Sequence, residues 1–378
     1  MNLFSENFTF SNYGDAVIPI GISFFTFQQI NYLFNVYKKE IKIPTWIEYI
    51  TFISFFPQLI AGPIITANEI LPQIKKIKSF DYSNVSVGFS IFVIGLSKKI
   101  LLADNLAIFA DKIFLGVENG VEIFFFEAWL GAICFGLQIY FDFSAYSDMA
   151  IGLGRMFGFK FPVNFLSPYK SKSIIEFWRC WHITLSRFLK NFIYIPLGGS
   201  KGKSYRTYLN LMITMILGGI WHGSGLTFVI WGFAHGLLLA INHLIKNFNI
   251  LINPNIKIFF TFTSVIFLWV AFRSNNIDNM LNMWSTMLGF GGISISSKLI
   301  FFEFIPFIKF NGFHSGELVN LNHLTIIVII TLFIIFKFPN TYDLLSDFDP
   351  ALNYKNNFIN SYSLKWRPNL LWSILISL

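Results

Sequence analysis

The chain has 378 residues, of which 54% are hydrophobic and 19% aromatic, while only 13% are charged. An ordinary soluble domain has about 25% charged residues, so these proportions argue against a water-soluble protein and predict a membrane protein with several spans. The formal net charge of +8 comes from basic residues placed between apolar segments, which is typical of cytoplasmic loops and excludes a nucleic-acid partner.

Five segments are long and apolar enough to be membrane spans. A helix needs about 20 apolar residues to cross about 30 Å of hydrocarbon. The candidates are residues 16–36, 123–143, 224–245, 256–272 and 324–338. Because shorter or broken apolar stretches lie between them, we expect an all-α, polytopic integral membrane protein whose helices surround an interior that solutes can reach.

The segment at residues 47–67 is apolar but is interrupted by Pro57, Gly62 and Pro63, and lysine clusters flank it on both sides. If both clusters are cytoplasmic, this segment enters the membrane and returns. Such backbone is tolerated at membrane depth only where protein or a water-filled cavity satisfies its amides and carbonyls. The pattern therefore predicts either a re-entrant cavity wall or a proline-kinked helix.

Residues 85–96 form another apolar stretch, and it is too short to cross the membrane. Lys98 and Lys99 follow it directly, and charged side chains are costly within the hydrocarbon. We therefore expect a partial span that ends at these two lysines.

Two carboxylates, Asp142 and Asp148, lie with two serines and Tyr146 at the end of the span at residues 123–143. Buried charges need water, a partner or a substrate. The motif is consistent either with a functional polar site or with a helix cap at the membrane surface. Because intramembrane acids also occur in transporters, a transporter or channel is an alternative function.

The strongest marker of a cytoplasmic loop is the region from residue 170 to residue 206, where eight basic residues accompany the single acid Glu176. Within it, apolar residues recur at helical spacing and polar residues follow on another face. The apolar set is Ile174, Trp178, Trp181, Leu185 and Phe188, and the polar set is Glu176, Arg179, His182 and Ser186. This pattern predicts one amphipathic helix that lies along the membrane interface or packs on the spans.

The most informative single residue is His222, in the Trp-His-Gly turn between two apolar segments at residues 207–221 and 224–245. An ionisable residue deep in a membrane is a functional candidate by default. A neutral imidazole can accept a proton from a hydroxyl, which is the task of a general base. The alternative is a buried histidine that joins two helices through hydrogen bonds.

The other candidate groups have weaker patterns. His235 follows His222 by 13 residues, about 140° around a helix axis, so we expect it to be a packing residue. The residues expected to be interfacial or inert are His243, His314, His323, Cys134 and Cys180. Residues 196–203 predict a glycine-rich loop without the spacing of a phosphate-binding P-loop, and no metal motif is present.

Five ordered motifs together resemble the membrane-bound O-acyltransferase (MBOAT) family, and specifically its bacterial branch typified by alginate O-acetyltransferase. The motifs are SFFTFQQINYLFNVY at residues 23–37, FFPQLIAGPI at 55–64, LQIYFDFSAYSDMAIGLGRMFGFKFPVNF at 137–165, EFWRCWHITLSRFLKNFIYIPLGGS at 176–200 and LGGIWHGSGLTFVIWGFAHG at 217–236. The similarity is collinear from about residue 23 to residue 243.

The resemblance implies a multi-helix bundle with re-entrant segments around a funnel and a tunnel through the bilayer. It also implies that His222 is the principal catalytic histidine and that His182 is its companion, without a metal or a bound cofactor. An acetyl group from a cytosolic thioester, expected to be acetyl-CoA, would enter the tunnel. His222 would remove the proton of the attacking hydroxyl.

The expected function is therefore O-acetylation of an extracytoplasmic polysaccharide, as in alginate biosynthesis, directly or through a partner acetyltransferase. The expected location is the bacterial cytoplasmic membrane. Alternatives are acyl transfer of the teichoic-acid D-alanylation type and a non-catalytic transporter or assembly subunit. We expect residues 1–378 to form a single membrane-embedded domain that lacks N-terminal spans and the end of the last helix relative to the family.

Overall fold

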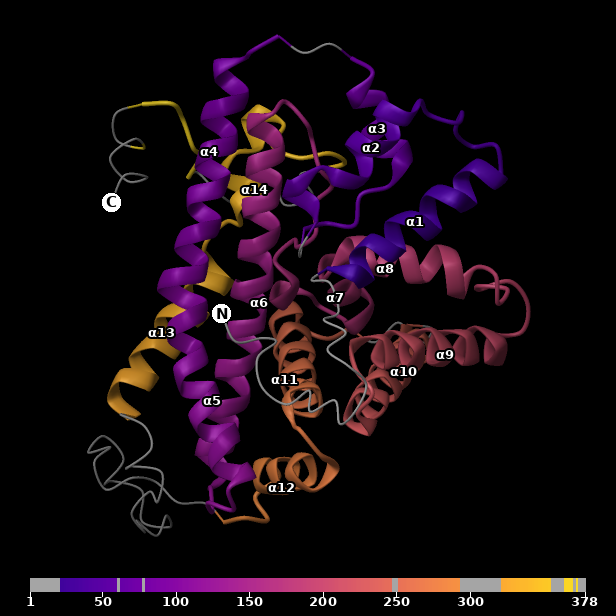
Figure 1. The fold of residues 1–378 in the computed structure, drawn as a ribbon. Helices are drawn as coiled ribbons and strands as arrows, with labels where there is room; N and C mark the ends of the chain where they lie inside the picture. The colour runs from indigo at the N-terminus through magenta and orange to yellow at the C-terminus, as the bar shows by residue number, and fades with distance from the viewer. Residues whose placement is uncertain are drawn as a thin grey trace, which may run out of the picture.

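The computed structural model describes residues 21–59, 62–76, 79–246, 251–292, 321–354, 364–369 and 372. Within these residues the fold is all-α, as predicted, and the single pairing of extended segments is an isolated parallel bridge between Pro162 and Leu352. Figure 1 shows two long helical rods on one side of the molecule and a group of shorter helices on the other.

The helices are named in chain order. The N-terminal ones are α1 (Ile22–Tyr37), α2 (Trp46–Ser54), α3 (Ala67–Ile74), α4 (Tyr82–Ser97), α5 (Asp104–Glu118) and α6 (Phe125–Met156). The central ones are α7 (Ile174–Cys180), α8 (Ile183–Leu189), α9 (Ser204–His222) and α10 (Leu226–Lys246). The C-terminal ones are α11 (Pro254–Arg273), α12 (Ile277–Met287), α13 (Leu321–Lys337) and α14 (Thr341–Leu344).

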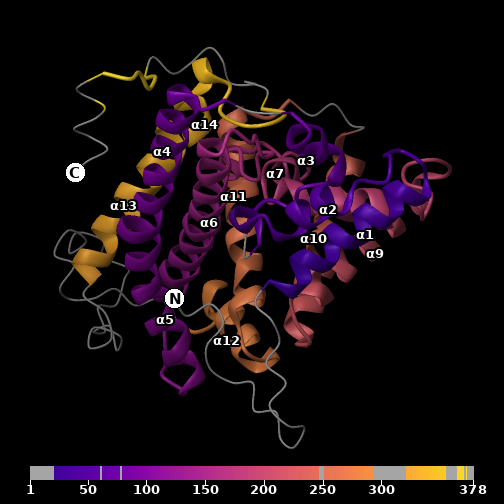
Figure 2. The ribbon, with the colours of Figure 1, turned by 45° about the horizontal axis from the view of Figure 1, so that its top comes forward.

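The first rod consists of α4, a π-helical segment at Lys98–Ala103, and α5. It is continuous over 37 residues and runs beside α6 in both Figure 1 and Figure 2. The prediction of a partial span ending at Lys98 and Lys99 is therefore wrong. The helix continues because each lysine forms an ion pair with a buried carboxylate of α6, which offsets the cost of placing its charge there.

Two glycines allow α4 and α6 to approach closely. A Cβ atom on Gly88 would lie 2.6 Å from the carbonyl oxygen of Gly152, and a Cβ on Gly152 would lie 2.5 Å from the carbonyl oxygen of Gly88. Neither position has room for a side chain, so the two backbones are in direct contact. Small residues at such crossings are typical of helix pairs in membranes.

Four described helices are long and apolar enough to cross a membrane: Tyr82–Glu118, Phe125–Met156, Leu226–Ile245 and Pro254–Arg273. The last three confirm the predicted apolar helices at residues 123–143, 224–245 and 256–272. The predicted spans at 16–36 and 324–338 correspond to α1 and α13, which have 16 and 17 residues. Residues 16–20 lie outside the described part of the chain.

The segment at residues 47–67 is broken, as its prolines predicted. It contains α2, a single 3-10 turn at Phe56–Gln58, an extended stretch at residues 63–66 and the first residue of α3. Ile60 and Ala61 lie outside the described residues. This extended stretch approaches the centre of the molecule, where it contacts α8.

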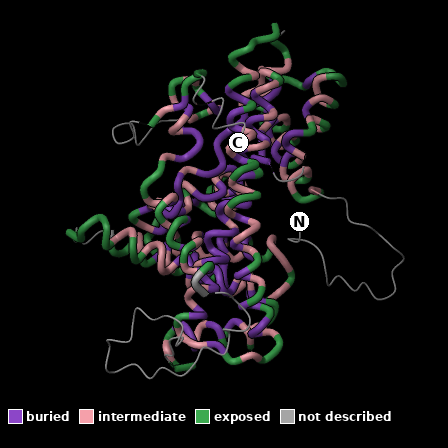
Figure 3. The backbone as a smooth tube through the Cα atoms, turned by 90° about the vertical axis from the view of Figure 1, so that its left-hand side faces the viewer, coloured by how far each residue is buried: buried purple, intermediate pink, exposed green. Residues whose placement is uncertain are grey.

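The hairpin of α9 and α10 is equally tight. A Cβ on Gly219 would lie 2.2 Å from the carbonyl oxygen of Phe228, and a Cβ on Gly232 would lie 2.4 Å from that of Met215. Backbone therefore approaches backbone directly along the two helices that flank His222. Figure 3 shows buried residues through the middle of the molecule, and the largest cluster of buried apolar side chains includes residues of α6, α7, α10 and α11.

Candidate functional site

His182 lies at a break between two short helices. The predicted single amphipathic helix over residues 174–188 is wrong, because α7 ends at Cys180 and α8 begins at Ile183. Trp181 is extended, and His182 has a left-handed backbone with φ 42°. The break turns His182 away from a polar surface and into the interior, where it is only 2% exposed. A strained backbone at a buried histidine is a feature typical of functional sites.

Asn164 holds this break in place. Its carbonyl oxygen accepts the backbone N–H of Ile183 at 2.9 Å. Its side-chain Oδ1 accepts the N–H and the hydroxyl of Thr184 at 3.2 and 2.9 Å, and it lies 3.2 Å from Nδ1 of His182. Asn164 is completely buried, so one asparagine fixes both the backbone and the ring of the histidine.

His222 is the last residue of α9, and aromatic rings enclose it. Its ring centroid lies 4.7 Å from that of Trp221, 4.9 Å from Phe272 and 5.4 Å from Trp231. The chain turns directly after it, at Gly223. Aromatic rings therefore form an apolar wall beside the imidazole, and His222 itself is half-buried.

The two histidines belong to one site. They come from different elements, the α7–α8 break and the end of α9. Phe24 of α1 lies beside both elements, with its ring centroid 6.4 Å from that of His182 and 6.0 Å from that of Trp221. The structure thus brings together the two residues that the sequence singled out from separate motifs.

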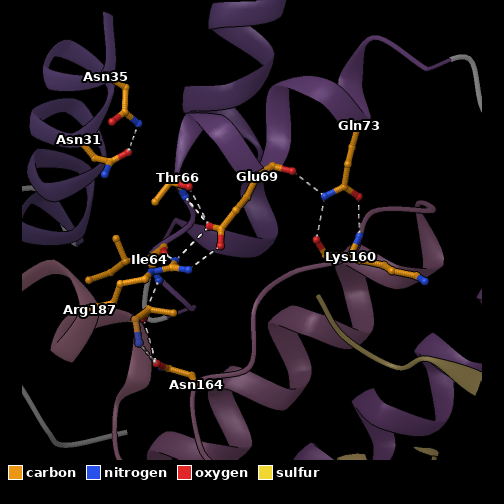
Figure 4. Close-up of polar contacts among 10 residues, drawn as sticks. Asn31, Asn35, Ile64, Thr66, Glu69, Gln73, Lys160, Asn164 and Arg187 are labelled. Carbon is orange, nitrogen blue, oxygen red and sulfur yellow. Dashed lines mark hydrogen bonds and ion pairs between the residues drawn. The ribbon is translucent and has the colours of Figure 1, made fainter. Parts of the chain in front are cut away.

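A polar cluster adjoins the site on the side of α8 and α3 (Figure 4). Arg187 of α8 donates to both carboxylate oxygens of Glu69, at 2.6 and 3.0 Å, and to the carbonyl oxygen of Ile64 at 3.4 Å. The N–H of Ile64 donates to Thr184, at 3.0 Å. Because Thr184 also donates to Asn164, hydrogen bonds connect the 63–66 stretch to the His182 break.

A small pocket opens at this cluster. Its lining residues are Asn31, Ile64, Thr66, Thr184, Arg187, Phe188, Asn191 and Phe192. Asn31 comes from α1, which has a buried polar face that also includes Gln28 and Asn35. Two asparagine amides, two threonine hydroxyls and a guanidinium therefore meet beside aromatic rings.

Asp142 and Asp148 pair with lysines of the first rod, and no hydrogen bond joins either of them to His182 or His222 among the described contacts. Asp148 accepts Lys98 at 2.7 Å and the hydroxyls of Thr341 and Tyr342 at 2.6 Å each, and Asp142 pairs with Lys99 at 2.7 Å. Both acids lie inside α6, so the helix-cap interpretation is wrong. Their lysine partners explain the buried charges without ion transport.

The remaining histidines lie elsewhere. His235 is fully buried and accepts Trp178 Nε1–H at its Nδ1, 3.3 Å away, as expected of a packing residue. The expected angle of about 140° around one helix axis is wrong, because His222 lies on α9 and His235 on α10. His243 lies near the end of α10, His323 near the start of α13, and His314 outside the described residues.

No sequence pattern indicated Asn164, Thr184 or the Glu69–Arg187 pair as site residues. Asn164 and Arg187 do lie inside the motifs at 137–165 and 176–200, but no spacing rule connects residues so far apart in the chain. Among the described residues, no group of three or more His, Cys, Asp or Glu side chains is placed to hold a metal ion.

Comparison with known proteins gives matches in one family. A family model described as "MBOAT, membrane-bound O-acyltransferase family" matches residues 6–283. The peptidoglycan O-acetyltransferase of Helicobacter pylori is 41% identical over 310 residues, covering 74% of this chain and 58% of that protein. The probable alginate O-acetylase AlgI of Pseudomonas aeruginosa is 42% identical over 283 residues, covering 74% and 53%.

More distant matches carry a different name. The teichoic acid D-alanyltransferase of Streptococcus thermophilus is 26% identical over 239 residues, covering 59% of this chain and 56% of that protein. The chain therefore spans somewhat more than half the length of the curated relatives that it matches.

Proposed function

Because the chain belongs to the membrane-bound O-acyltransferase family, we propose that it transfers an acetyl group from a cytosolic thioester donor to a hydroxyl group outside the cytoplasm. The acceptor is a polysaccharide or a partner acetyltransferase that modifies one. The names of the more similar relatives, at 41% and 42% identity, support acetyl as the acyl group. The location that follows is the bacterial cytoplasmic membrane.

The observation that carries this proposal is the placement of the buried His182 and the half-buried His222 beside one aromatic wall. In the proposed reaction, the oxygen of the acceptor hydroxyl attacks the thioester carbonyl while His222 takes the proton of that hydroxyl. The carbon–sulfur bond breaks, and the departing thiolate receives that proton from His222. His182 positions the acceptor by a hydrogen bond to a second group of it, because the one hydrogen of the attacking hydroxyl goes to His222.

The proposed donor is acetyl-CoA, and it requires no bound cofactor. A thiolate is a good leaving group, so a correctly placed base and a water-poor site supply the main catalytic effects. The basic residues between residues 170 and 206 support an approach of the anionic donor from the cytoplasmic side.

The test is incorporation of labelled acetate into surface polysaccharide in cells that express the native gene. We expect His222→Ala at matched membrane abundance to lose incorporation by at least about a hundredfold, which is the contribution typical of general base catalysis. His323→Ala, a histidine near the start of α13, is the control and should keep the wild-type rate. Equal incorporation in wild type and His222→Ala would refute the assignment of His222 as the base.

The second candidate is transfer of D-alanine, which the 26% match to a teichoic acid D-alanyltransferase favours. The same cells supplied with labelled D-alanine distinguish the two reactions. If His222-dependent labelling of the envelope comes from D-alanine and not from acetate, D-alanine transfer replaces acetyl transfer as the proposed function.

A further inference from the structure

The buried amide of Asn164 has only one orientation that its neighbours allow. The backbone N–H of Thr184 lies 3.2 Å from Oδ1 of Asn164, and a backbone N–H can only donate. The Thr184 hydroxyl accepts the N–H of Ile64, at 3.0 Å, and directs its own hydrogen to the same Oδ1, at 2.9 Å. Nδ2 of Asn164 donates to the hydroxyl of Ser147 at 3.1 Å. A flipped amide would place its NH2 group against the backbone N–H of Thr184, which cannot accept.

This orientation decides which nitrogen of His182 carries hydrogen. Nδ1 of His182 lies 3.2 Å from Oδ1 of Asn164, which is an acceptor, so Nδ1 must be the donor. A neutral imidazole has one N–H, so Nε2 has a free lone pair. Nε2 is buried and has no hydrogen-bond partner in the protein. A buried acceptor without a partner is costly, which indicates a ligand that donates to it.

We propose that Asn164 is a positioning residue that holds His182 in the Nδ1–H tautomer, so that Nε2 of His182 accepts a hydrogen bond from a donor group of the acceptor other than the attacking hydroxyl. This inference rests on the proposed function for the identity of the acceptor. The tautomer itself follows from the geometry alone, and it gives the two histidines different tasks. His182 orients the acceptor, and His222 removes the proton of its attacking hydroxyl.

The side chain and the backbone of Asn164 can be separated experimentally. Asn164→Leu keeps similar volume and the carbonyl that accepts the N–H of Ile183, but it removes Oδ1. Asn164→Asp keeps an acceptor for Thr184 and for Nδ1–H of His182. Asn210→Leu is the matched control, because Asn210 is a buried asparagine whose amide donates to Gly199 in a loop.

The first readout is independent of activity. Nitrogen-15 NMR of the purified protein with labelled histidine, with His182 assigned by its absence in His182→Gln, reports which ring nitrogen is protonated. We expect Nδ1–H in wild type, Asn164→Asp and Asn210→Leu, and loss of that preference in Asn164→Leu. An Nε2–H tautomer in wild type would overturn the inference.

The second readout is acetyl transfer at matched membrane abundance. We expect Asn164→Leu to lower kcat at least about tenfold with little change in KM, and Asn164→Asp to restore most of it. In a His182→Ala background, Asn164→Leu should cause no further loss, because Asn164 acts through His182. If wild type has the Nδ1–H tautomer but transfers no acetyl group, only the proposed function is refuted. If Asn164→Leu keeps the full kcat, only the positioning role of Asn164 is refuted.

Discussion

At the scale of single residues, the backbone of His182 is the unusual feature of the site. A left-handed backbone at a residue with a side chain costs about 1–2 kcal/mol, and glycine is exempt from most of this cost. The surrounding hydrogen bonds of Asn164 must therefore hold His182 in place. This conformation aims the ring at the site, which a continuous helix over residues 174–188 would not do.

We therefore expect His182→Gly to be about 1 kcal/mol more stable than His182→Ala. Both variants lose the imidazole and leave similar cavities, so their difference reports the backbone alone. Thermal unfolding of the purified protein in detergent measures it. At His243, inside α10, the order should reverse, with Ala more stable than Gly. The same order at both positions would contradict a strained backbone at His182.

The sequence alone indicated some of the site residues clearly and others not at all. His222 could be singled out because a histidine in a long apolar context is rare, and His182 because of its motif. Asn164 gave no such signal, since one asparagine near the end of an apolar motif has many ordinary explanations. Its importance depends on Thr184 and Ile64, which are 20 and 100 positions away in the sequence.

At the scale of elements, glycine determines which helices pack together. Gly88 and Gly152 let α4 and α6 touch, while Gly219 and Gly232 do the same for α9 and α10. Both pairs position the site, because α6 leads into the segment that contains Asn164 and α9 ends at His222. Backbone contact of this kind leaves little freedom for the helices to slide.

We expect Gly152→Ala to destabilise the protein by about 1–3 kcal/mol, because its Cβ would overlap a carbonyl oxygen of α4 that cannot move independently. Gly218→Ala is the control, since a Cβ there meets only the flexible side-chain end of Leu189 at 3.2 Å. Its effect should be small or stabilising, because alanine favours helix. The measurement is the midpoint of thermal unfolding in detergent. An equal loss in both variants would contradict direct backbone contact.

Helix periodicity predicted elements well where the apolar run is long and poorly where the chain bends at the site. The helices α6 and α10 begin within two residues of their predicted spans, and α11 contains its predicted span. The predicted helix over 174–188 was wrong because the helical spacing of apolar residues continues through Trp181 and His182, although the helix itself breaks there. Backbone hydrogen bonds with Asn164 and Leu166 interrupt the helix at this point. The predicted partial span at 85–96 was wrong because the sequence around Lys98 and Lys99 does not reveal their partners. These partners, Asp142 and Asp148, lie on another helix.

At the scale of the whole molecule, one buried polar cluster joins distant parts of the chain. Lys98 from the first rod donates to Asp148 of α6 and to the hydroxyl of Thr341 in α14, both at 2.7 Å. Tyr342 donates to the other oxygen of Asp148. The cluster therefore fixes the C-terminal segment to the two rods.

We expect Lys98→Met to destabilise the protein by about 3–5 kcal/mol, because it leaves Asp148 buried without its cation. Lys98→Met with Asp148→Asn should recover much of the loss, since the amide is uncharged. Thermal unfolding, with limited proteolysis after residue 337, reports both stability and release of α14. Lys365→Met, which breaks an ion pair at the surface, should change stability by at most about 1 kcal/mol. No recovery in the double variant would contradict a charge-based effect.

The π-helical segment at Lys98–Ala103 has a consequence for how the first rod meets α6. An α-helix turns about 100° per residue, and a π-helical turn takes in one residue more than an α-helical turn. The two halves of the rod are therefore out of phase with each other. α4 presents Gly88 and Gly95 to α6, and α5 presents Ile113 to Gly131 of the same helix. A single amphipathic pattern drawn through residues 82–118 would lose its phase at the lysines, although the chain itself never leaves the helix.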